Sequence, residues 1–161
     1  MAKLYAQPYS IGHTGFYFDS MEAFDCGMEQ LNNSGCEEVE IQFIDGESHQ
    51  SSLFNAASID QNRVSLWFDE LEDLTTNDAT RLCFLLDLGW SLDNALNRYD
   101  EVCIHCGTAS DYAQELIEET TEIPENLRYY IDYEAIARDM CINGEIVKIE
   151  HDLIITNAHE F

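Results

Sequence analysis

The N-terminal part of the chain alternates apolar and polar residues with the period of a β-strand. Residues 3–7 and 15–18 are therefore predicted to be two strands joined by a turn. A short helix is predicted at 21–31, where Asp19 or Ser20 supplies the side chain that caps its first turn. The beginning of the chain thus combines a sheet with one helix.

A further strand is predicted at 37–44, because every second residue there is apolar. The apolar positions are Val39, Ile41 and Phe43. The positions between them include Glu38 and Glu40, so the outer face of this half-buried strand is expected to be acidic.

The middle of the chain changes to helical spacing, with apolar residues three or four positions apart. One helix is predicted to start at Ser58 or Asp60. A second covers 77–88 and ends at Gly89, since glycine suits the left-handed position after a helix. A third begins after Ser91, which is a good N-cap residue.

The last third returns to mixed structure. A short strand is predicted at 102–106, and Thr108 or Ser110 is expected to cap a helix over 109–121. Pro124 is predicted to end that helix and to open the next, at 127–140, because proline is tolerated in a first turn. Two final strands, predicted at 145–149 and 153–156, are expected to form a hairpin.

These elements predict an α+β protein. We expect three small modules in a row along an elongated body. The first is an N-terminal α+β module at 1–57, with an antiparallel sheet and a helix. The second is a central helical module at 58–101, and the third is a C-terminal α+β module at 102–161 that ends in the hairpin.

The net charge limits the partners that such a protein can bind. The chain has 161 residues, and its 7 Lys and Arg face 32 Asp and Glu, which gives a net charge of −25. With 45% hydrophobic and 11% aromatic residues it is not a disordered acidic tail. Acidic residues are in large excess in every part of the chain. Such a surface repels phosphate backbones and anionic membranes, so it favours basic partners or cations.

The N-terminus and the six cysteines add little to this picture. The N-terminus has no apolar run behind Lys3, and no stretch reaches the length of a membrane span, so a soluble, cytoplasmic protein is expected. In that compartment the cysteines are expected to be reduced thiols. They are Cys26, Cys36, Cys83, Cys103, Cys106 and Cys141.

No motif in the sequence supports catalysis or a metal site. Cys103-x-x-Cys106 lacks the second ligand pair of a structural zinc site, and the pair is more simply two thiols on a strand. Ser48-His49 is interpreted as a polar loop pair, and no nucleophile elbow or phosphate loop is present. The acidic stretch 69–73 does not have the spacing of an EF-hand loop. We therefore expect no enzyme, no cofactor and no bound metal.

The predicted helix 109–121 has one strongly acidic face. At about 100° per residue, five carboxylates fall within an arc of ~100°, with apolar residues opposite and no Lys or Arg on the helix. These carboxylates belong to Asp111, Glu115, Glu118, Glu119 and Glu122. Like charges four residues apart cost roughly 0.2–0.5 kcal/mol per pair. The face is either simply solvated or used for recognition.

The spacing of these carboxylates is close to that of DNA phosphates. From Asp111 to Glu122 the helix rises ~16 Å, or about one charge per 4 Å, against one per ~3.4 Å along a DNA strand. The whole charge of −25 corresponds to roughly 42 Å of duplex. A protein can therefore reproduce the electrostatic outline of DNA.

The C-terminal third closely resembles the ArdA antirestriction family. The matching segments are Tyr112-Ala113-x-Glu115-Leu116, Ile123-Pro124-x-x-Leu127, Tyr130-Ile131-Asp132-Tyr133-Glu134, Ala137-Arg138-Asp139, Asn143-Gly144 and the terminal Phe161. Upstream, Gly15-Phe16-Tyr17 is similar to an early Gly-Ala-Trp strand of the family, with Phe-Tyr in place of Ala-Trp. The stretch 38–45 keeps only scattered residues of the family's Ile-His-Asp-Tyr-Glu strand.

The resemblance implies a curved, elongated homodimer that mimics bent B-form DNA. Such proteins are carried by plasmids, transposons and phages. They occupy the DNA-binding groove of type I restriction–modification enzymes, namely the methyltransferase core with its specificity subunit, and bind neither nucleic acid nor membrane. The acidic partner-binding surface is then expected at Asp111, Glu115, Glu118, Glu119, Glu122, Glu125, Asp132, Glu134, Glu38 and Glu40. Packing within the motif or the dimer is expected from Tyr129, Tyr130, Ile131 and Tyr133.

Two other functions remain open from the sequence. The same charge suits an acidic module that sequesters another basic DNA-binding or defence protein. The carboxylate clusters and Cys103-x-x-Cys106 would suit a cation-binding or enzymatic domain.

Overall fold

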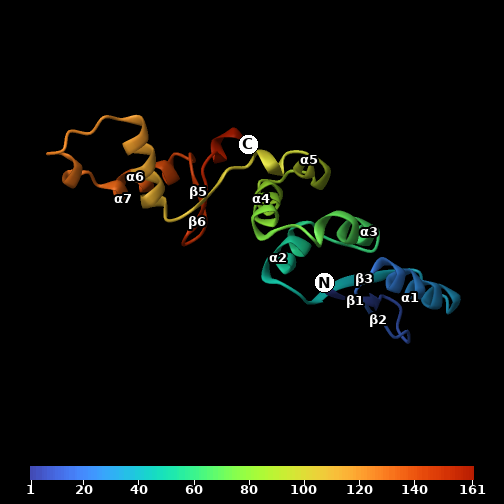
Figure 1. Cartoon of the computed structure of the whole chain (residues 1–161). Coiled ribbons are helices and arrows are strands. Elements are labelled where there is room, and N and C mark those ends of the chain that lie inside the picture. Colours follow the sequence, from blue (N-terminus) through green and yellow to red (C-terminus); the bar gives the residue numbers. More distant parts are fainter. The chain divides into compact units, whose positions relative to one another are not determined.

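The computed structural model describes residues 1–161 and confirms the predicted α+β class. It contains seven α-helices and two antiparallel three-stranded sheets (Figure 1). The chain divides into two compact units, Met1–Asn97 and Arg98–Phe161, and each contains one of the sheets. The three-module, elongated arrangement stays a prediction.

The sheet of the first unit has the strand order β2-β1-β3. Strand β1 spans Lys3–Pro8 and pairs antiparallel with β2 (Phe16–Phe18) and with β3 (Val39–Asp45). The three strands lie close to their predicted positions. Their inner face is apolar and buried, at Leu4, Ala6, Phe18, Val39 and Ile41.

Helix α1 (Met21–Asn33) packs on the inner face of this sheet. Ser20 caps it as predicted, because its hydroxyl accepts the backbone N–H of Ala23 at 3.3 Å. The ring of Phe24 lies 4.9 Å from that of Phe18. Gly27 faces the ring of Phe16, where an added Cβ would lie only 2.2 Å from the nearest ring carbon. The close approach of helix and strand therefore requires glycine at this position.

Helix α2 (Ser48–Ala56) corrects the interpretation of Ser48-His49 as a loop pair. The residue before it is Glu47, which is not a typical N-cap, so no cap residue marks this start in the sequence. The helix start is instead closed by the side chain of Gln50, whose Oε1 accepts the backbone N–H of Glu47 at 2.9 Å. Leu53 and Phe54 are buried and hold the helix in the core.

The remaining helices of the first unit follow α2 in the chain, and a buried tryptophan lies directly after the first of them. They are α3 (Val64–Leu66), which continues as a π-helical turn at Trp67–Leu71, then α4 (Thr76–Asp87) and α5 (Leu92–Leu96). The indole of Trp67 is fully buried and meets the rings of Phe43 and Phe54 edge-on, at centroid distances of 6.2 and 5.3 Å. Ser91 caps α5 as predicted.

The helix predicted from Ser58 or Asp60 starts later than expected. Ser58 has a positive φ of 51°, which breaks any helix at that point. The guanidinium of Arg63 donates to the carbonyl oxygens of Ala57 and Ser58, at 2.9 and 3.3 Å. These bonds fix a turn over 58–63, and regular helix begins only at Val64.

The second unit covers one sheet with two helices. Strands β4 (Ile104–Cys106), β5 (Val147–Glu150) and β6 (Leu153–Ile155) have the order β4-β6-β5, which confirms the closing hairpin. Helices α6 (Ala109–Thr120) and α7 (Tyr133–Ile142) contact each other. Small side chains let them approach, in a core formed by Ala109, Ala113, Ala137, Met140, Ile146 and Ile154.

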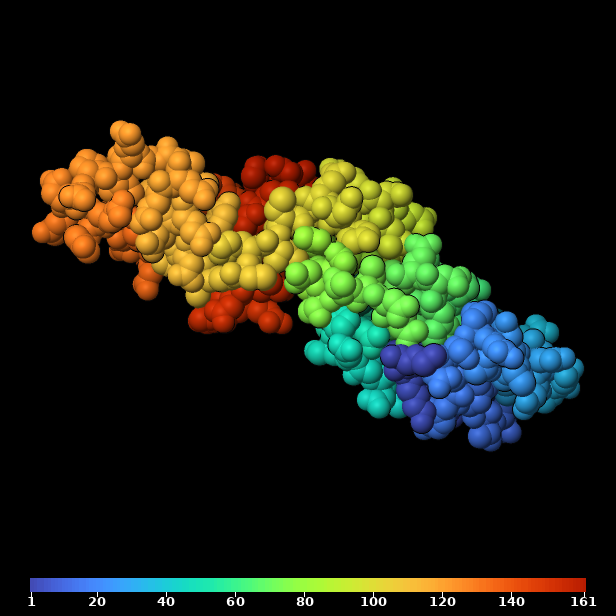
Figure 2. Space-filling model, viewed as in Figure 1, coloured from blue at the N-terminus to red at the C-terminus, as the bar shows by residue number.

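The helix predicted at 127–140 is present but starts later than expected. Arg128–Tyr130 forms a single 3₁₀ turn, and regular helix begins only at Tyr133. The carboxylate of Asp132 causes this late start, because it accepts the backbone N–H of Ala135 at 2.9 Å and so caps α7. Pro124 begins a turn and not a helix. The segment 121–132 therefore forms a mostly irregular connection on the surface of this unit (orange in Figures 1 and 2).

Candidate functional site

Almost every carboxylate of the chain lies on the surface. Of the 32 Asp and Glu side chains, only Glu72 is buried and only Asp78 is half-buried. Two ion pairs join a Lys or Arg side chain to a carboxylate, Arg81–Asp78 at 2.9 Å and Arg98–Glu101 at 2.6 Å. The negative charge is therefore exposed and nearly uncompensated within the chain.

Helix α6 presents the densest ordered row of these carboxylates. Asp111, Glu115, Glu118 and Glu119 are exposed on one side, while Ala109 and Ala113 are buried on the other. The four carboxylates cover eight residue steps, or ~12 Å at a helical rise of about 1.5 Å, so they again average about one charge per 4 Å. None of the four has a Lys or Arg partner.

Asp111 begins this row and also caps the helix. Its carboxylate accepts the hydroxyl and the backbone N–H of Thr108, at 2.7 and 3.0 Å. The side-chain bond, then the backbone bond, then the nearby His105 together hold the pKa of Asp111 below its usual value. The spacing Thr108-x-x-Asp111 is that of a capping box, so this helix start is also marked in the sequence.

Contacts from neighbouring elements orient Glu115 and Glu118. Glu115 lies 3.7 Å from the ring of His105 on β4. Glu118 accepts from the side-chain amide of Gln114 at 3.1 Å and from the hydroxyl of Tyr133 on α7 at 3.5 Å. These contacts limit the rotamers of two carboxylates in the row, which reduces the entropy that binding would cost.

The end of α6 is electrostatically unfavourable for the isolated protein. Glu118 and Glu119 lie in its last turn, and no basic residue is present there. The C-terminus of a helix carries partial negative charge, so each acidic residue in this turn costs roughly 0.3–1 kcal/mol. A cationic partner would relieve this repulsion.

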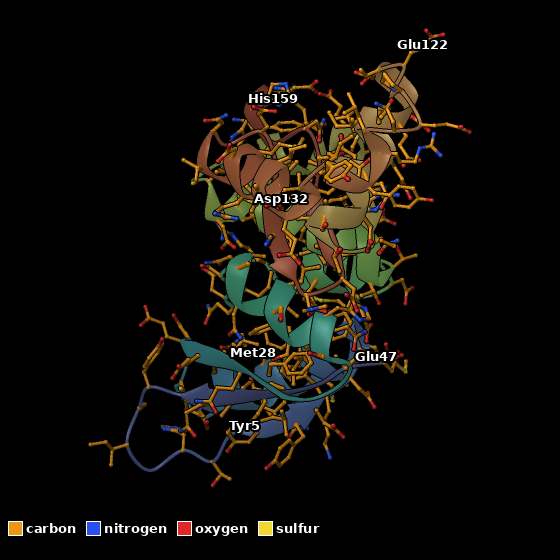
Figure 3. The ribbon with its side chains drawn as sticks, turned by 90° about the vertical axis from the view of Figure 1, so that its left-hand side faces the viewer. Tyr5, Met28, Glu47, Glu122, Asp132 and His159 are labelled. Atoms are coloured by element: carbon orange, nitrogen blue, oxygen red, sulfur yellow. The ribbon has the colours of Figure 1, made fainter.

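Glu122 and Glu125 do not continue the helical row. Because α6 ends at Thr120 and Thr121 is extended, the prediction of Glu122 on the helix face is wrong. Glu122 lies in the connection 121–132 and points away from the helices (Figure 3). It lines an open pocket of about 540 Å³ together with Glu118, Glu119 and Arg128. Glu125 is exposed in the turn that follows.

The other expected acidic contacts are divided between the two units. Asp132 is exposed but already accepts a capping bond from α7, and Glu134 is exposed in the first turn of that helix. Glu38 and Glu40 are exposed at the start of β3, in the first unit. The structure brings Asp111, Glu115, Glu118 and Glu119 together on one helix face, whereas Glu38 and Glu40 belong to the other unit.

The aromatic residues expected to pack differ in exposure. Tyr129 is 93% exposed and Tyr130 is 84% exposed, so neither packs within its own chain. Ile131 and Tyr133 are half-buried. The exposed pair lies in the connection 121–132, next to Leu127, which is 50% exposed.

The cysteines form no disulfide, and no three His, Cys, Asp or Glu side chains are placed to hold a metal ion. Burial, reinforced by the charge of Asp87, raises the pKa of the Cys83 thiol to about 11. None of the helices combines the length and the apolar character needed to cross a membrane.

Comparison with known proteins identifies one matching family. The family model of the ArdA antirestriction proteins matches residues 10–154, which is nearly the whole chain. A search of curated proteins found no match. The family match extends upstream of the C-terminal segments that carry the resemblance in the sequence, and so includes most of the first unit.

Proposed function

Because the chain belongs to the ArdA family of antirestriction proteins, we propose that it inhibits its target by mimicking DNA. Membership implies an antirestriction function directed at type I restriction–modification enzymes, and the family is one of inhibitors rather than of known enzymes. The proposal adds the mechanism. The acidic surface occupies the groove in which the methyltransferase core and its specificity subunit bind DNA.

The observation that carries this proposal is the row of carboxylates on α6. Asp111, Glu115, Glu118 and Glu119 are exposed, lack Lys or Arg partners and follow each other at about the spacing of phosphates. Two of them oppose the dipole of their own helix. A sequence selected for stability alone would place basic residues in that last turn. The charge is therefore best explained by use in binding.

Inhibition then follows from competition for the same cations. The Lys and Arg side chains that neutralise DNA phosphates in the target groove meet carboxylates instead, and the charge of −25 accelerates encounter. The carboxylates do not reproduce the edges of bases. We therefore expect the protein to inhibit type I enzymes that recognise different DNA sequences.

A homodimer is a further part of the proposal. The connection 121–132 exposes apolar side chains at three nearby positions, Leu127, Tyr129 and Tyr130. Tyrosine is enriched in protein interfaces. Sedimentation of Y129S/Y130S should show a loss of dimer, whereas Y9S, which alters an exposed tyrosine of the first unit, should not. A wild-type protein that sediments as a monomer at micromolar concentration would contradict this part.

Competition between the protein and DNA for a purified type I methyltransferase tests the mechanism. The informative variant is E115Q/E118Q/E119Q, which keeps side-chain size and hydrogen bonding while removing three charges from α6. Its control, E22Q/D25N/E29Q, removes three exposed charges from α1. With about 0.2–1 kcal/mol for each of three lost surface pairs, the α6 variant should inhibit roughly 3- to 150-fold more weakly.

The outcome separates the proposal from its alternatives. If the two triple variants lose the same inhibition, net charge and not the α6 row is responsible. If the wild-type protein in excess at low salt leaves DNA binding unchanged, the DNA-mimic mechanism is wrong for that enzyme. An acidic module that sequesters another basic protein would then be the better description.

A further inference from the structure

The second unit contains a groove whose charge is opposite to that of the rest of the surface. It lies between α7 and β5 and has a volume of about 750 Å³. Buried core residues, among them Ala109, Ala137 and Ile146, form part of its lining. Arg138, Lys148 and His151 also line it, and Glu134 is the only carboxylate that does.

The groove holds two of the chain's seven Lys and Arg residues, and neither forms an ion pair with a carboxylate, as is also true of Lys3, Arg63 and Arg128. Elsewhere, Arg81 and Arg98 form ion pairs with carboxylates, and Lys3 lies over the ring of Tyr17. Arg138 and Lys148 form no ion pair although the chain has 32 carboxylates. The groove therefore carries two cations against one carboxylate, that of Glu134, and is complementary to an acidic ligand.

The strand beside the groove has a free edge. In the order β4-β6-β5, strand β5 pairs with β6 only, so its other edge offers unpaired backbone groups. Lys148 pairs in register with Ile154, whose side chain belongs to the core under the helices. Because paired residues share a face, Lys148 projects to the helix side, where the groove lies.

The groove also offers an exposed apolar contact. Ile142, at the end of α7, is 75% exposed, and Val147 on β5 is half-buried. A free strand edge with cations and aliphatic side chains beside it suits an extended polypeptide, since an added strand gains backbone hydrogen bonds and places alternate side chains on the groove.

We propose that this groove binds an acidic, extended segment of a partner protein, which adds as a strand to β5. Carboxylates of the segment pair with Arg138 and Lys148, and its aliphatic side chains cover Ile142. The proposal is independent of the antirestriction mechanism. A groove that binds DNA is itself basic, so it would repel Arg138 and Lys148 instead of pairing with them. It gives the protein a second partner with charge opposite to the first.

Titration of the full-length ¹⁵N-labelled protein with a synthetic peptide tests this inference. The probe is an acetylated, amidated peptide with the repeat Asp-Ser-Val-Ser, which puts Asp and Val in turn on the one strand face that meets the groove. The control peptide has Asn in place of Asp. At ~0.15 M salt the Debye length is about 8 Å, which screens the repulsion from distant carboxylates. We expect saturable shifts of the backbone amides of β5 and of Arg138, with binding about tenfold weaker for the Asn peptide.

The matched variants are R138Q/K148Q and R128Q. Arg128 also forms no ion pair with a carboxylate but lies outside the groove, so its loss changes charge without altering the proposed site. The double variant should weaken binding of the Asp peptide at least tenfold and R128Q should not. The proposal would be overturned if both variants lost the same affinity for the Asp peptide, if the amide shifts were confined to elements other than β5 and α7, or if no saturable binding occurred. An R138Q/K148Q variant that changes the oligomeric state would also overturn it, because a second copy would then occupy the groove.

Discussion

Replacing Glu119 by glutamine should make the protein more stable and a weaker inhibitor at the same time. Glu119 is exposed in the last turn of α6, and no hydrogen bond or ion pair of its carboxylate would be lost. Removal of its charge relieves the repulsion from the helix C-terminus, worth roughly 0.3–1 kcal/mol. It also removes the like-charge pair with Glu115 four residues earlier, worth roughly 0.2–0.5 kcal/mol. The free energy of unfolding should rise by about 0.5–1.5 kcal/mol.

Urea unfolding at low and high salt, followed by circular dichroism, measures this change. The midpoint for E119Q should exceed that of the wild type at low salt, and the difference should shrink at ~1 M salt, where the Debye length is about 3 Å. The matched control is E22Q in the first turn of α1, where an acidic residue favours the helix. E22Q should therefore lower stability.

The same two variants are then compared as inhibitors of DNA binding by a type I methyltransferase. E119Q should inhibit more weakly than E22Q although it is the more stable protein, so a folding defect cannot explain the loss. A neutral or destabilising effect of E119Q, or a gain that salt does not reduce, would refute the electrostatic reasoning about α6.

Three further predictions concern single residues. Because the pKa of Asp111 is lowered in the folded protein, its ionised carboxylate stabilises the fold at pH values above the ordinary carboxyl pKa, and this contribution is lost as pH falls through the folded-state pKa. The free energy of unfolding of D111N, measured with urea between pH 3 and 7, should therefore fall less toward low pH than that of the wild type. Gly27→Ala should destabilise the first unit by about 1–3 kcal/mol in the same assay, because the new Cβ meets the ring of Phe16; an unchanged midpoint would contradict the packing described. Cys83, with a pKa of about 11, should react with iodoacetamide at pH 8 more slowly than the exposed Cys26 and Cys103, as peptide mass spectrometry can show.

Much of the fold could be predicted because its signals are local. Alternating residues identified the strands of the first sheet, and the hydroxyls of Ser20, Ser91 and Thr108 marked three helix starts that the structure confirms. Helix α2 had no such signal, since its first turn is closed by Gln50, and this side chain also donates to the carbonyl oxygen of Glu72. A contact across 22 residues cannot be inferred from local pattern.

The candidate site was predictable in part for the same reason. Helical spacing placed Asp111, Glu115, Glu118 and Glu119 on one face, because that face depends only on the helix. Glu122 was placed wrongly, since the end of α6 was expected too late. The orientation of Glu118 depends on Tyr133 from another helix, which no spacing within α6 could indicate.

The two sides of α6 differ in how freely their residues can be exchanged. On the inner side Ala109 and Ala113 are buried against α7 and the sheet, so a larger side chain there would separate the elements. On the outer side no apolar packing constrains the carboxylates, and Glu119 could become Asp, Gln or Lys without disturbing the core. A lineage can therefore retune the charge of this surface one residue at a time, while the backbone that carries it stays the same.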